Sequence, residues 1–396
     1  MSDGSDRARA RRAFVDAWQH EIVRRRPPRR TDADDRLGLL GTSGGSNPKA
    51  TRCGYANAVV VGDAAYLVDA GEGAHRQMWR AGITANPRFG PGRPLVGVVC
   101  ITHLHADHIM DLANLFQGSW PTTPVDVYGP GPAGPPFTGH LDTGHLDTGH
   151  LDTGRADPVH PVRFPETPAP GTRAVLQLLD RAFATNINAR IIAEGRADYV
   201  DLVRVHEIGP ADEQVHPDDV RILTSGPSAF RNRSDPGYVV PDMEPFQVRA
   251  EDDHGVTITA TLVDHAPMFP ALAYRFDTPT GSVVFSGDTG PCDNVVRLAR
   301  GADLLVHEVF DLGYWVDKMP ASMPNRDRVI AQLARSHTPV EAVADIAERA
   351  GVDTLVLSHL VPGDGGHTEV EWETMAQPGF SGRVVCGVDL DEFAIG

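Results

Sequence analysis

The sequence predicts an α/β protein in which helices cover the faces of β-sheets. Segments rich in valine, leucine and isoleucine alternate with segments of helical periodicity, and 41% of the 396 residues are hydrophobic, enough for a substantial core. Five of the apolar segments also end in histidine, aspartate or glutamate. Because open α/β sheets bind ligands at the ends of their strands, we expect several strand ends to meet at one polar site.

The composition narrows the classes of function. The chain holds 36 Lys and Arg against 53 Asp and Glu, a net charge of −17 with His neutral. Proteins that grip nucleic-acid backbone usually carry a basic face, so this charge disfavours nucleic acid as a partner. The sequence contains no run of about 18 apolar residues, so no membrane span is predicted. The N-terminal segment also lacks the apolar stretch of a signal peptide. The four cysteines form no CxxC pair, so we expect free thiols in a cytoplasmic protein.

Residues 1–30 differ from the rest and are predicted to form a basic helical extension. They hold nine arginines and four acidic residues, with Phe14, Trp18 and Ile22 at helical spacing before two prolines. A solvated basic face explains this pattern, and a membrane-surface or partner-binding helix is the alternative. We expect residues 31–396 to form the main domain.

The first part of that domain alternates strands and turns. Residues 55–73 predict a hairpin that turns at Gly62 and Asp63, and residues 75–83 predict a short helix. An apolar strand then leads into the segment VVCITHLHADHIMDL at 98–112.

An insertion is expected at about 130–235. Its first part is rich in proline and glycine and repeats the unit TGHLD three times at 138–152. A period of five matches neither helix nor strand, so we expect a mobile surface loop and exclude its histidines from the site. Residues 172–206 predict helices, broken at Gly195, that form a cap near the active site. Phe183 and Tyr199 of this cap are candidates to line the pocket, with core packing as the alternative.

The C-terminal part returns to alternating elements. Residues 256–265 predict a strand, and residues 271–289 a hairpin that turns at Thr280 and Gly281. A strand at 302–310 comes next, and Thr338 is the expected N-cap of a helix, with Glu341 completing a capping box. The last predicted strand covers residues 353–360. Tyr314, Trp315 and His367 are candidates for the rim of the pocket.

The segment at 98–112 predicts a metal site. His103 and His105 are two residues apart, so on an extended segment their side chains point the same way and can bind one ion. Asp107 and His108 follow where the chain must turn, and can face a second ion. Imidazole and carboxylate ligands suit zinc, and two ions about 3.5–4 Å apart could activate a shared hydroxide. Asp288 in SGDT is the candidate for the bridging carboxylate.

The segments THLHADH, VDH, SGDT, HEV and LSH, in this order, resemble the metallo-β-lactamase superfamily. The segment LLGTSGGSNP and the 22-residue spacing from His337 to His359 resemble its branch of ribonuclease Z and zinc arylsulfatases. The resemblance implies an αββα sandwich with two Zn²⁺ ions, with Mn²⁺ or Fe²⁺ as alternatives. The implied ligands are His103, His105 and His265 for one ion, Asp107, His108 and His359 for the other, and Asp288 between them.

The resemblance also implies the catalytic residues. Asp107 belongs to them as well as to the ligands, and His337, oriented by Glu308, would donate a proton to the leaving group. Asp69 is expected to support a ligand loop.

The predicted function is hydrolysis of small or medium anionic esters, either sulfate esters or phosphodiesters, by a metal-bound hydroxide. Ribonuclease Z-type cleavage at the 3′ end of tRNA is an alternative, as is hydrolysis of a lactone, thioester or β-lactam. Bacterial ribonuclease Z carries a long tRNA-binding arm after the segment that matches HAPMFPALAYRF, whereas only DTPTG follows here. His105 stands where diiron redox members carry glutamate, which disfavours that class. We also expect a homodimer.

Overall fold

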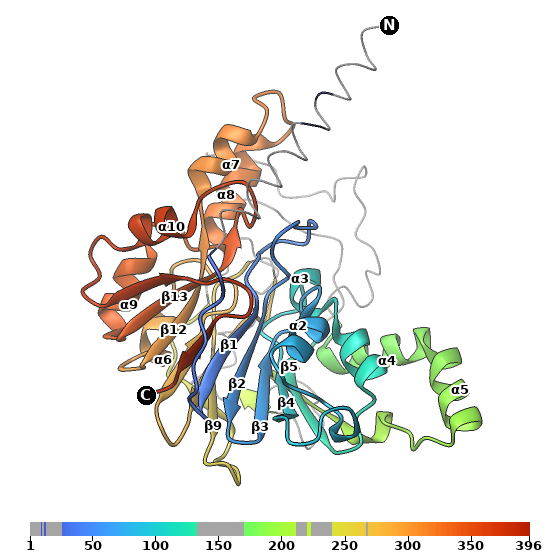
Figure 1. The fold of residues 1–396 in the computed structure, drawn as a ribbon. Coiled ribbons are helices and arrows are strands. Elements are labelled where there is room, and N and C mark those ends of the chain that lie inside the picture. The colour runs from blue at the N-terminus through green and yellow to red at the C-terminus, as the bar shows by residue number, and fades with distance from the viewer. Residues whose placement is uncertain are drawn as a thin grey trace, which may run out of the picture.

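Two β-sheets pack face to face, with helices on the outer face of each (Figure 1). The computed structural model describes residues 26–132, 170–210, 220–222, 240–266 and 268–396, together with Arg9 and Arg12. The predicted αββα sandwich is confirmed. The remainder of the N-terminal extension and the TGHLD repeat lie outside the described residues.

The first sheet has eight strands in the order β15-β1-β2-β3-β4-β5-β6-β7. Neighbours from β15 to β3 are antiparallel, and neighbours from β3 to β7 are parallel. The strands are β1 (Arg36–Gly41), β2 (Ala56–Val61), β3 (Ala64–Val68), β4 (Leu95–Cys100), β5 (Val125–Pro130), β6 (Val203–Pro210), β7 (Val220–Ile222) and β15 (Glu392–Ala394).

The second sheet has seven strands in the order β14-β13-β12-β11-β10-β9-β8, antiparallel from β8 to β11 and parallel from β11 to β14. The strands are β8 (Phe246–Arg249), β9 (Thr257–Leu262), β10 (Leu272–Asp277), β11 (Ser282–Phe285), β12 (Leu304–Phe310), β13 (Thr354–Val361) and β14 (Arg383–Cys386). Both predicted hairpins are confirmed: β2 pairs with β3 across Gly62 and Asp63, and β10 pairs with β11 across residues 278–281.

Three hydrophobic clusters hold these layers together. The first lies between the sheets and includes Val59, Tyr66, Ile258 and Val306. The second joins the outer face of the second sheet to α6 (Asp293–Leu298), α9 (Val343–Ala350) and α10 (Glu369–Ala376). The third joins the outer face of the first sheet to α2 (Ala74–Arg80), α4 (Thr172–Ala182) and α5 (Ala184–Glu194). Short helical segments complete the fold: η1 (Pro87–Phe89), α3 (Ala106–Ile109), η2 (Asn114–Gly118) and η3 (Val200–Leu202).

The helices predicted for 172–206 end earlier than expected. The α5 helix ends at Glu194, because Gly195 takes a left-handed conformation (φ 62°). Residues 203–210 form β6, parallel to β5, so the prediction of helix there is wrong. Apolar and polar residues alternate in VRVHEI, a pattern that favours a strand where the edge of β5 is available for pairing. Tyr199 lies buried in the third cluster and forms hydrogen bonds with Gln117 and Asp180. The structure therefore supports core packing for Tyr199, the alternative to a place in the pocket wall.

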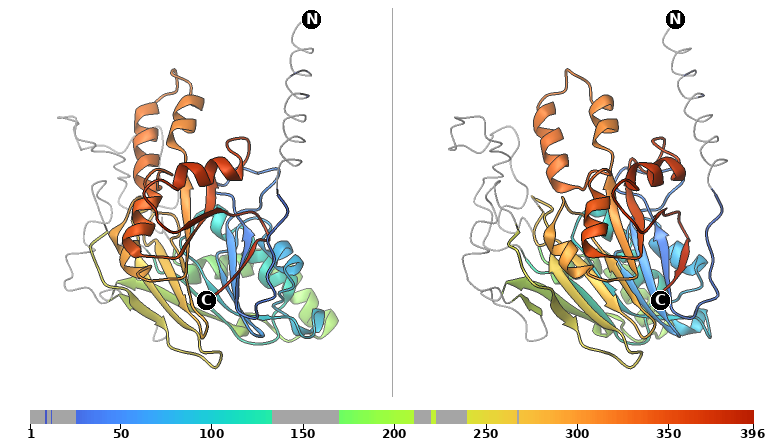
Figure 2. Two further views of the ribbon diagram at one scale, coloured as in Figure 1. Left: turned by 60° about the vertical axis from the view of Figure 1, so that its left-hand side comes forward. Right: turned by 90° about the vertical axis from the view of Figure 1, so that its left-hand side faces the viewer.

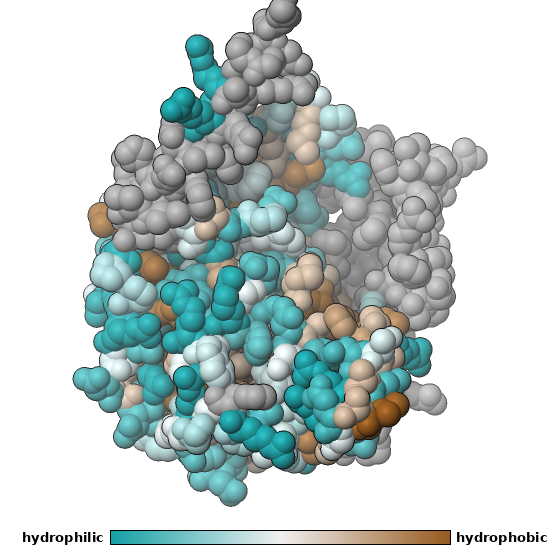
Figure 3. All heavy atoms as spheres, turned by 45° about the vertical axis from the view of Figure 1, so that its right-hand side comes forward, coloured by the Kyte–Doolittle hydropathy of each residue, from teal (hydrophilic) through white to brown (hydrophobic). Residues whose placement is uncertain are grey.

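Figure 3 shows the side of the molecule that carries α4 and α5, on which hydrophobic and hydrophilic groups are mixed. The exposed large hydrophobic residues include Leu178, Phe183 and Ile192 of the α4–α5 pair. Among the described helices, none combines the length and the hydrophobicity that a membrane span requires.

Two helices, α7 (Leu312–Lys318) and α8 (Arg326–Ser336), project beyond the ends of the sheets (Figure 2). The helix after them begins at Val343, so the prediction of Thr338 as N-cap is wrong. The backbone of residues 338–340 instead pairs with Phe310 at the end of β12. This parallel pairing sets residues 338–340 alongside the end of β12, and His337 therefore lies beside Glu308.

Candidate metal centre

Histidines and carboxylates at or just beyond the ends of five strands meet at one edge of the sandwich. The loops after β4, β9 and β11 supply His103, His265 and Asp288, while β12 and β13 supply Glu308 and His359. Two of the polar residues at strand ends point elsewhere. His307 is buried and bonds to the carbonyl oxygen of Glu308, and Asp264 lies beside His265 but outside the cluster. Successive side chains of a strand face opposite ways, so only one of each pair can reach the site.

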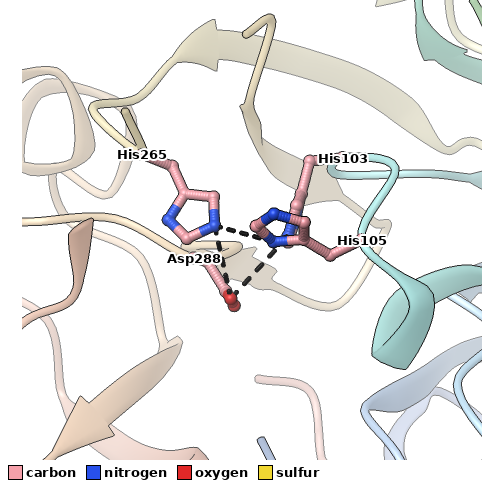
Figure 4. A group of neighbouring side chains, drawn as sticks. All are labelled: His103, His105, His265 and Asp288. Atoms are coloured by element: carbon pink, nitrogen blue, oxygen red, sulfur yellow. Dashed lines mark hydrogen bonds and ion pairs between the residues drawn. The ribbon is translucent and has the colours of Figure 1, made fainter. Parts of the chain in front are cut away.

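The first group of ligand atoms consists of three imidazole nitrogens and one carboxylate oxygen (Figure 4). Nδ1 of His105 lies 2.9 Å from Nε2 of His103 and 3.1 Å from Nε2 of His265. Oδ2 of Asp288 lies 3.7 and 3.8 Å from the latter two nitrogens. Ligand atoms about 2.0–2.1 Å from a tetrahedral ion lie roughly 3.3–3.5 Å apart, so these separations fit one ion.

The second group shares Asp288 with the first. Its Oδ1 atom lies 3.3 Å from Nε2 of His108 and 3.2 Å from Nε2 of His359. Oδ2 of Asp107 lies 3.7 and 3.3 Å from the same two nitrogens. Among the described residues, Nε2 of His108 and Oδ1 of Asp288 find no hydrogen-bond partner, although both are buried. An ion at the centre of the group would satisfy both atoms, which are costly to leave unpaired.

Further contacts fix the orientation of these side chains. Asp69 accepts hydrogen bonds from Nδ1 of His108 (2.8 Å) and from the backbone nitrogen and hydroxyl of Thr102 (both 2.7 Å). Nδ1 of His265 donates to the carbonyl of Ser336 (2.7 Å), and Asp107 accepts from the backbone of Gly45 (2.7 Å). Such contacts leave the opposite ring nitrogen of each histidine free for a metal. They also agree with the supporting role expected of Asp69.

Sequence reasoning missed two residues that shape the site. A side chain at Gly44 would overlap the ring of His359, and His359 itself has a positive φ of 46°, a strained conformation for this residue. Tyr55 is buried, with its ring 5.2 Å from that of His108 and 5.5 Å from that of His359. The glycine-rich motif GTSGGSNP was a signal for close approach at Gly44, whereas no local pattern pointed to Tyr55.

In the first group of ligand atoms, the electrostatics favour the metal-binding protonation states. Burial lowers the pKa of His265 to about 3, and burial also lowers the pKa values of His103 and His105 against the pull of Asp288. These three imidazoles are therefore neutral, the form that binds metals. Burial opposes the ionisation of Asp288, but His359 and the other neighbouring histidines hold its pKa well below the usual range. His108 differs, because Asp288 and Asp69 outweigh burial and raise its pKa.

His337 and Glu308 form a pair beside the ligand groups. Nδ1 of His337 lies 2.9 and 3.1 Å from the two oxygens of Glu308 and 4.0 Å from Oδ2 of Asp288. Burial disfavours the imidazolium, but the charge and hydrogen bonds of Glu308 raise the pKa of His337 to about 9. The ring stacks on Phe310 (5.6 Å, 21°), and its side chain is 15% exposed. His367 lies apart from the cluster and bonds to Asp311.

Comparisons with known proteins agree with this geometry. The family described as "Beta-lactamase superfamily domain" matches residues 157–360, and the "Metallo-beta-lactamase superfamily" matches residues 51–174. A ribonuclease Z of Mycobacterium bovis (strain BCG / Pasteur 1173P2) is 31% identical over 352 residues, which cover 89% of this chain and 95% of the relative. A ribonuclease Z of Mycobacterium tuberculosis (strain ATCC 25618 / H37Rv) is 30% identical with the same coverage.

Solved structures share the fold at low sequence identity. Human tRNase Z, short form, has a TM-score of 0.51 at 17% identity, covering 91% of this chain and 99% of that one. Zn²⁺-bound PqqB from Methylobacterium extorquens has a TM-score of 0.50 at 13% identity, covering 90% and 99%. The chain is therefore a metal-dependent hydrolase that belongs to the metallo-β-lactamase superfamily, in the branch that contains ribonuclease Z.

Proposed function

We propose that this protein hydrolyses phosphodiester bonds at a dinuclear zinc centre. The observation that carries the proposal is the position of Asp288, which presents Oδ2 to one group of ligand atoms and Oδ1 to the other. Both groups consist of imidazole and carboxylate without sulfur, a donor set that suits zinc. The proposed ligands are His103, His105 and His265 for one ion, Asp107, His108 and His359 for the other, and Asp288 for both.

A bound pair of ions would supply a nucleophile by lowering the pKa of a water molecule, and would offset negative charge on the ester. The chain's own residues supply the proton. Because Nδ1 of His337 is held by Glu308, Nε2 is the nitrogen that can donate to the leaving oxygen. With a pKa of about 9, His337 carries this proton at neutral pH.

The balance of charge favours an anionic ester. Two divalent ions add four positive charges, and protonated His337 adds one. Asp107, Asp288, Glu308 and the bound hydroxide together would subtract four, which leaves a net charge of +1 at the centre. A phosphodiester gains negative charge as it is attacked, so this centre would stabilise the transition state more than the substrate.

RNA is the substrate to test first within this class. The ribonuclease Z relatives match over 95% of their own length, so the likeness extends through both halves of the domain. The loop between β10 and β11, where the arm of bacterial ribonuclease Z would stand, is a tight turn over residues 278–281. A different surface of this protein would therefore have to bind a large RNA.

A panel of substrates tests the proposal. We expect the zinc-loaded protein to hydrolyse bis-p-nitrophenyl phosphate and to cleave a precursor tRNA, with Asp288→Asn as the inactive control. Hydrolysis of aryl sulfate or lactone alone, with neither phosphodiester cleaved, would overturn it. Metal analysis should find two zinc ions per chain, whereas iron would indicate the redox class. The predicted homodimer can be tested on the same sample by light scattering.

A further inference from the structure

A cavity of about 350 Å³ lies outside the candidate metal centre and carries an excess of positive charge. Its lining includes four basic residues, Lys49, Arg52, Arg76 and Arg80, and two carboxylates, Glu72 and Asp389. Four cations against two carboxylates leave a net charge of +2. Cys53 adds none, because burial raises the pKa of its thiol to about 11. This local excess stands in a chain whose net charge is −17.

Three of the four cations lack an acidic partner within the described chain. Lys49 donates to the carbonyls of Gly45 and Asn47, and Arg80 donates to the amide of Gln77. Arg76 contacts only the sulfur of Cys53, at 3.7 Å. Elsewhere, arginines such as Arg249 and Arg349 pair directly with carboxylates. The cavity therefore holds three cations that form no direct ion pair with a carboxylate of the described residues.

The remaining charged groups leave room for an anion. Both oxygens of Asp389 are engaged, Oδ1 by Thr42 and Oδ2 by the backbone of Cys53 and the side chain of Gln77. Arg52 is 5% exposed, and its Nε atom is buried without a partner although its terminal nitrogens are bonded. Glu72 is an exposed carboxylate that weakens but does not cancel the positive charge.

The cavity is connected to the candidate centre by short segments on two sides. Gly45, which holds Asp107 through its backbone nitrogen, also accepts a hydrogen bond from Lys49. On the other side, Gly71 packs so closely on the carbonyl of Asp107 that a side chain would overlap it, and the next residue is Glu72 of the lining. These two segments place the cavity on the side of the candidate centre that carries Asp107.

We propose that this cavity is a phosphate-binding subsite, in which Lys49, Arg76 and Arg80 hold a backbone phosphate of an RNA substrate outside the metal centre. The inference rests on the proposed phosphodiesterase function and adds a place outside the metal centre where the protein binds its substrate. The cavity would provide RNA-binding contacts that the tight turn between β10 and β11 cannot provide. Guanidinium groups suit this task because they bind phosphate through paired hydrogen bonds.

Salt-dependent binding tests the subsite separately from catalysis. The probe is a fluorescein-labelled, phosphorothioate-linked U12 oligonucleotide, followed by anisotropy from 50 to 400 mM KCl with the zinc-loaded full chain. The variant is Arg76→Ala with Arg80→Ala, two exposed positions on α2 where alanine maintains helix propensity. Arg383→Ala is the control. Arg383 is also exposed and has no acidic partner in the described chain, but it lies at the start of β14, opposite the strand ends that carry the site.

Each phosphate contact on a single strand contributes about −0.7 to the slope of log K against log salt. The double variant should therefore lose about 0.7 from the slope and bind roughly 5-fold more weakly at 0.1 M salt. The control should match the wild type. A double variant with the wild-type slope, or a wild type that does not bind the oligonucleotide, would overturn the subsite. Inorganic phosphate that binds to the protein without displacing the oligonucleotide would also overturn it, because the cavity would then hold a free anion.

Discussion

Replacing His337 with alanine should remove proton donation while leaving intact the two ligand groups that share Asp288. Nδ1 of His337 bonds to Glu308 and lies 4.0 Å from Oδ2 of Asp288, too far for a hydrogen bond. We therefore expect His337→Ala to retain the wild-type metal content. Removal of a general acid lowers turnover by about 10²–10⁴-fold, or about 2.7–5.4 kcal/mol in the activation barrier.

The size of this loss should depend on the leaving group and on pH. Glu308 raises the pKa of His337 to about 9, so the imidazolium is present at neutral pH and is lost as the pH rises through 9. The wild-type rate should fall above pH 9, and the variant should lack this decline. A nitrophenolate leaves without a proton, whereas an alkoxide needs one. The loss should then approach about 10⁴-fold for an alkyl diester and stay near about 10²-fold or less for an aryl diester.

The assay compares kcat for both diesters from pH 6 to 10, with zinc measured in the same samples. His367→Ala is the matched control, since His367 also pairs with a carboxylate, Asp311 at 2.5 Å, but lies outside the ligand groups. An equal loss for the two esters, or a loss that follows the zinc content, would refute the role of His337 as the acid. An alkaline limb that persists in the variant would also refute it.

Three further predictions concern the ligand groups. Asp288→Asn removes the shared carboxylate, so the variant should hold fewer than two zinc ions after dialysis, and retention of both would contradict the bridge. Asp69→Ala leaves Nδ1 of His108 and the hydroxyl of Thr102 without their acceptor, and zinc affinity in a chelator competition should fall by about 10–100-fold. Gly44→Ala forces the ring of His359 to move, so zinc should no longer raise the Tm by the wild-type amount, and an unchanged rise would show that the ring can shift without cost.

Much of the site was accessible from the sequence because its signals are local. The spacing of His103, His105, Asp107 and His108 is fixed by one strand end and one turn, and local geometry needs no knowledge of the rest of the chain. The strand ends that carry Asp288 and His359 could be recognised because charged residues rarely follow buried strands. The two hairpins were predictable for the same reason, since their turn residues and their strands are adjacent.

Other features depended on partners far along the chain. Residues 203–210 became β6 because the edge of β5 was available to them, and Thr338 became part of an extended segment because it pairs with the end of β12. Helical periodicity and a capping motif describe one segment alone, and tertiary pairing can override both. The positions of Gly44 and Tyr55 against the ring of His359 are contacts across more than 300 residues of sequence.

The amino-acid sequence by itself indicated an α/β class and the residues able to bind metal, because burial patterns and ligand chemistry belong to individual segments, whereas the αββα sandwich was expected from the family resemblance. The tertiary structure set the separations between these residues: Asp288 lies 3.3 Å from a nitrogen of His108 and 3.8 Å from one of His265, and Glu308 lies 2.9 Å from His337. It alone also gathered Lys49, Arg76 and Arg80 around one cavity. Separations of a few ångströms between distant segments follow from how sheets and loops pack, and no single segment encodes them.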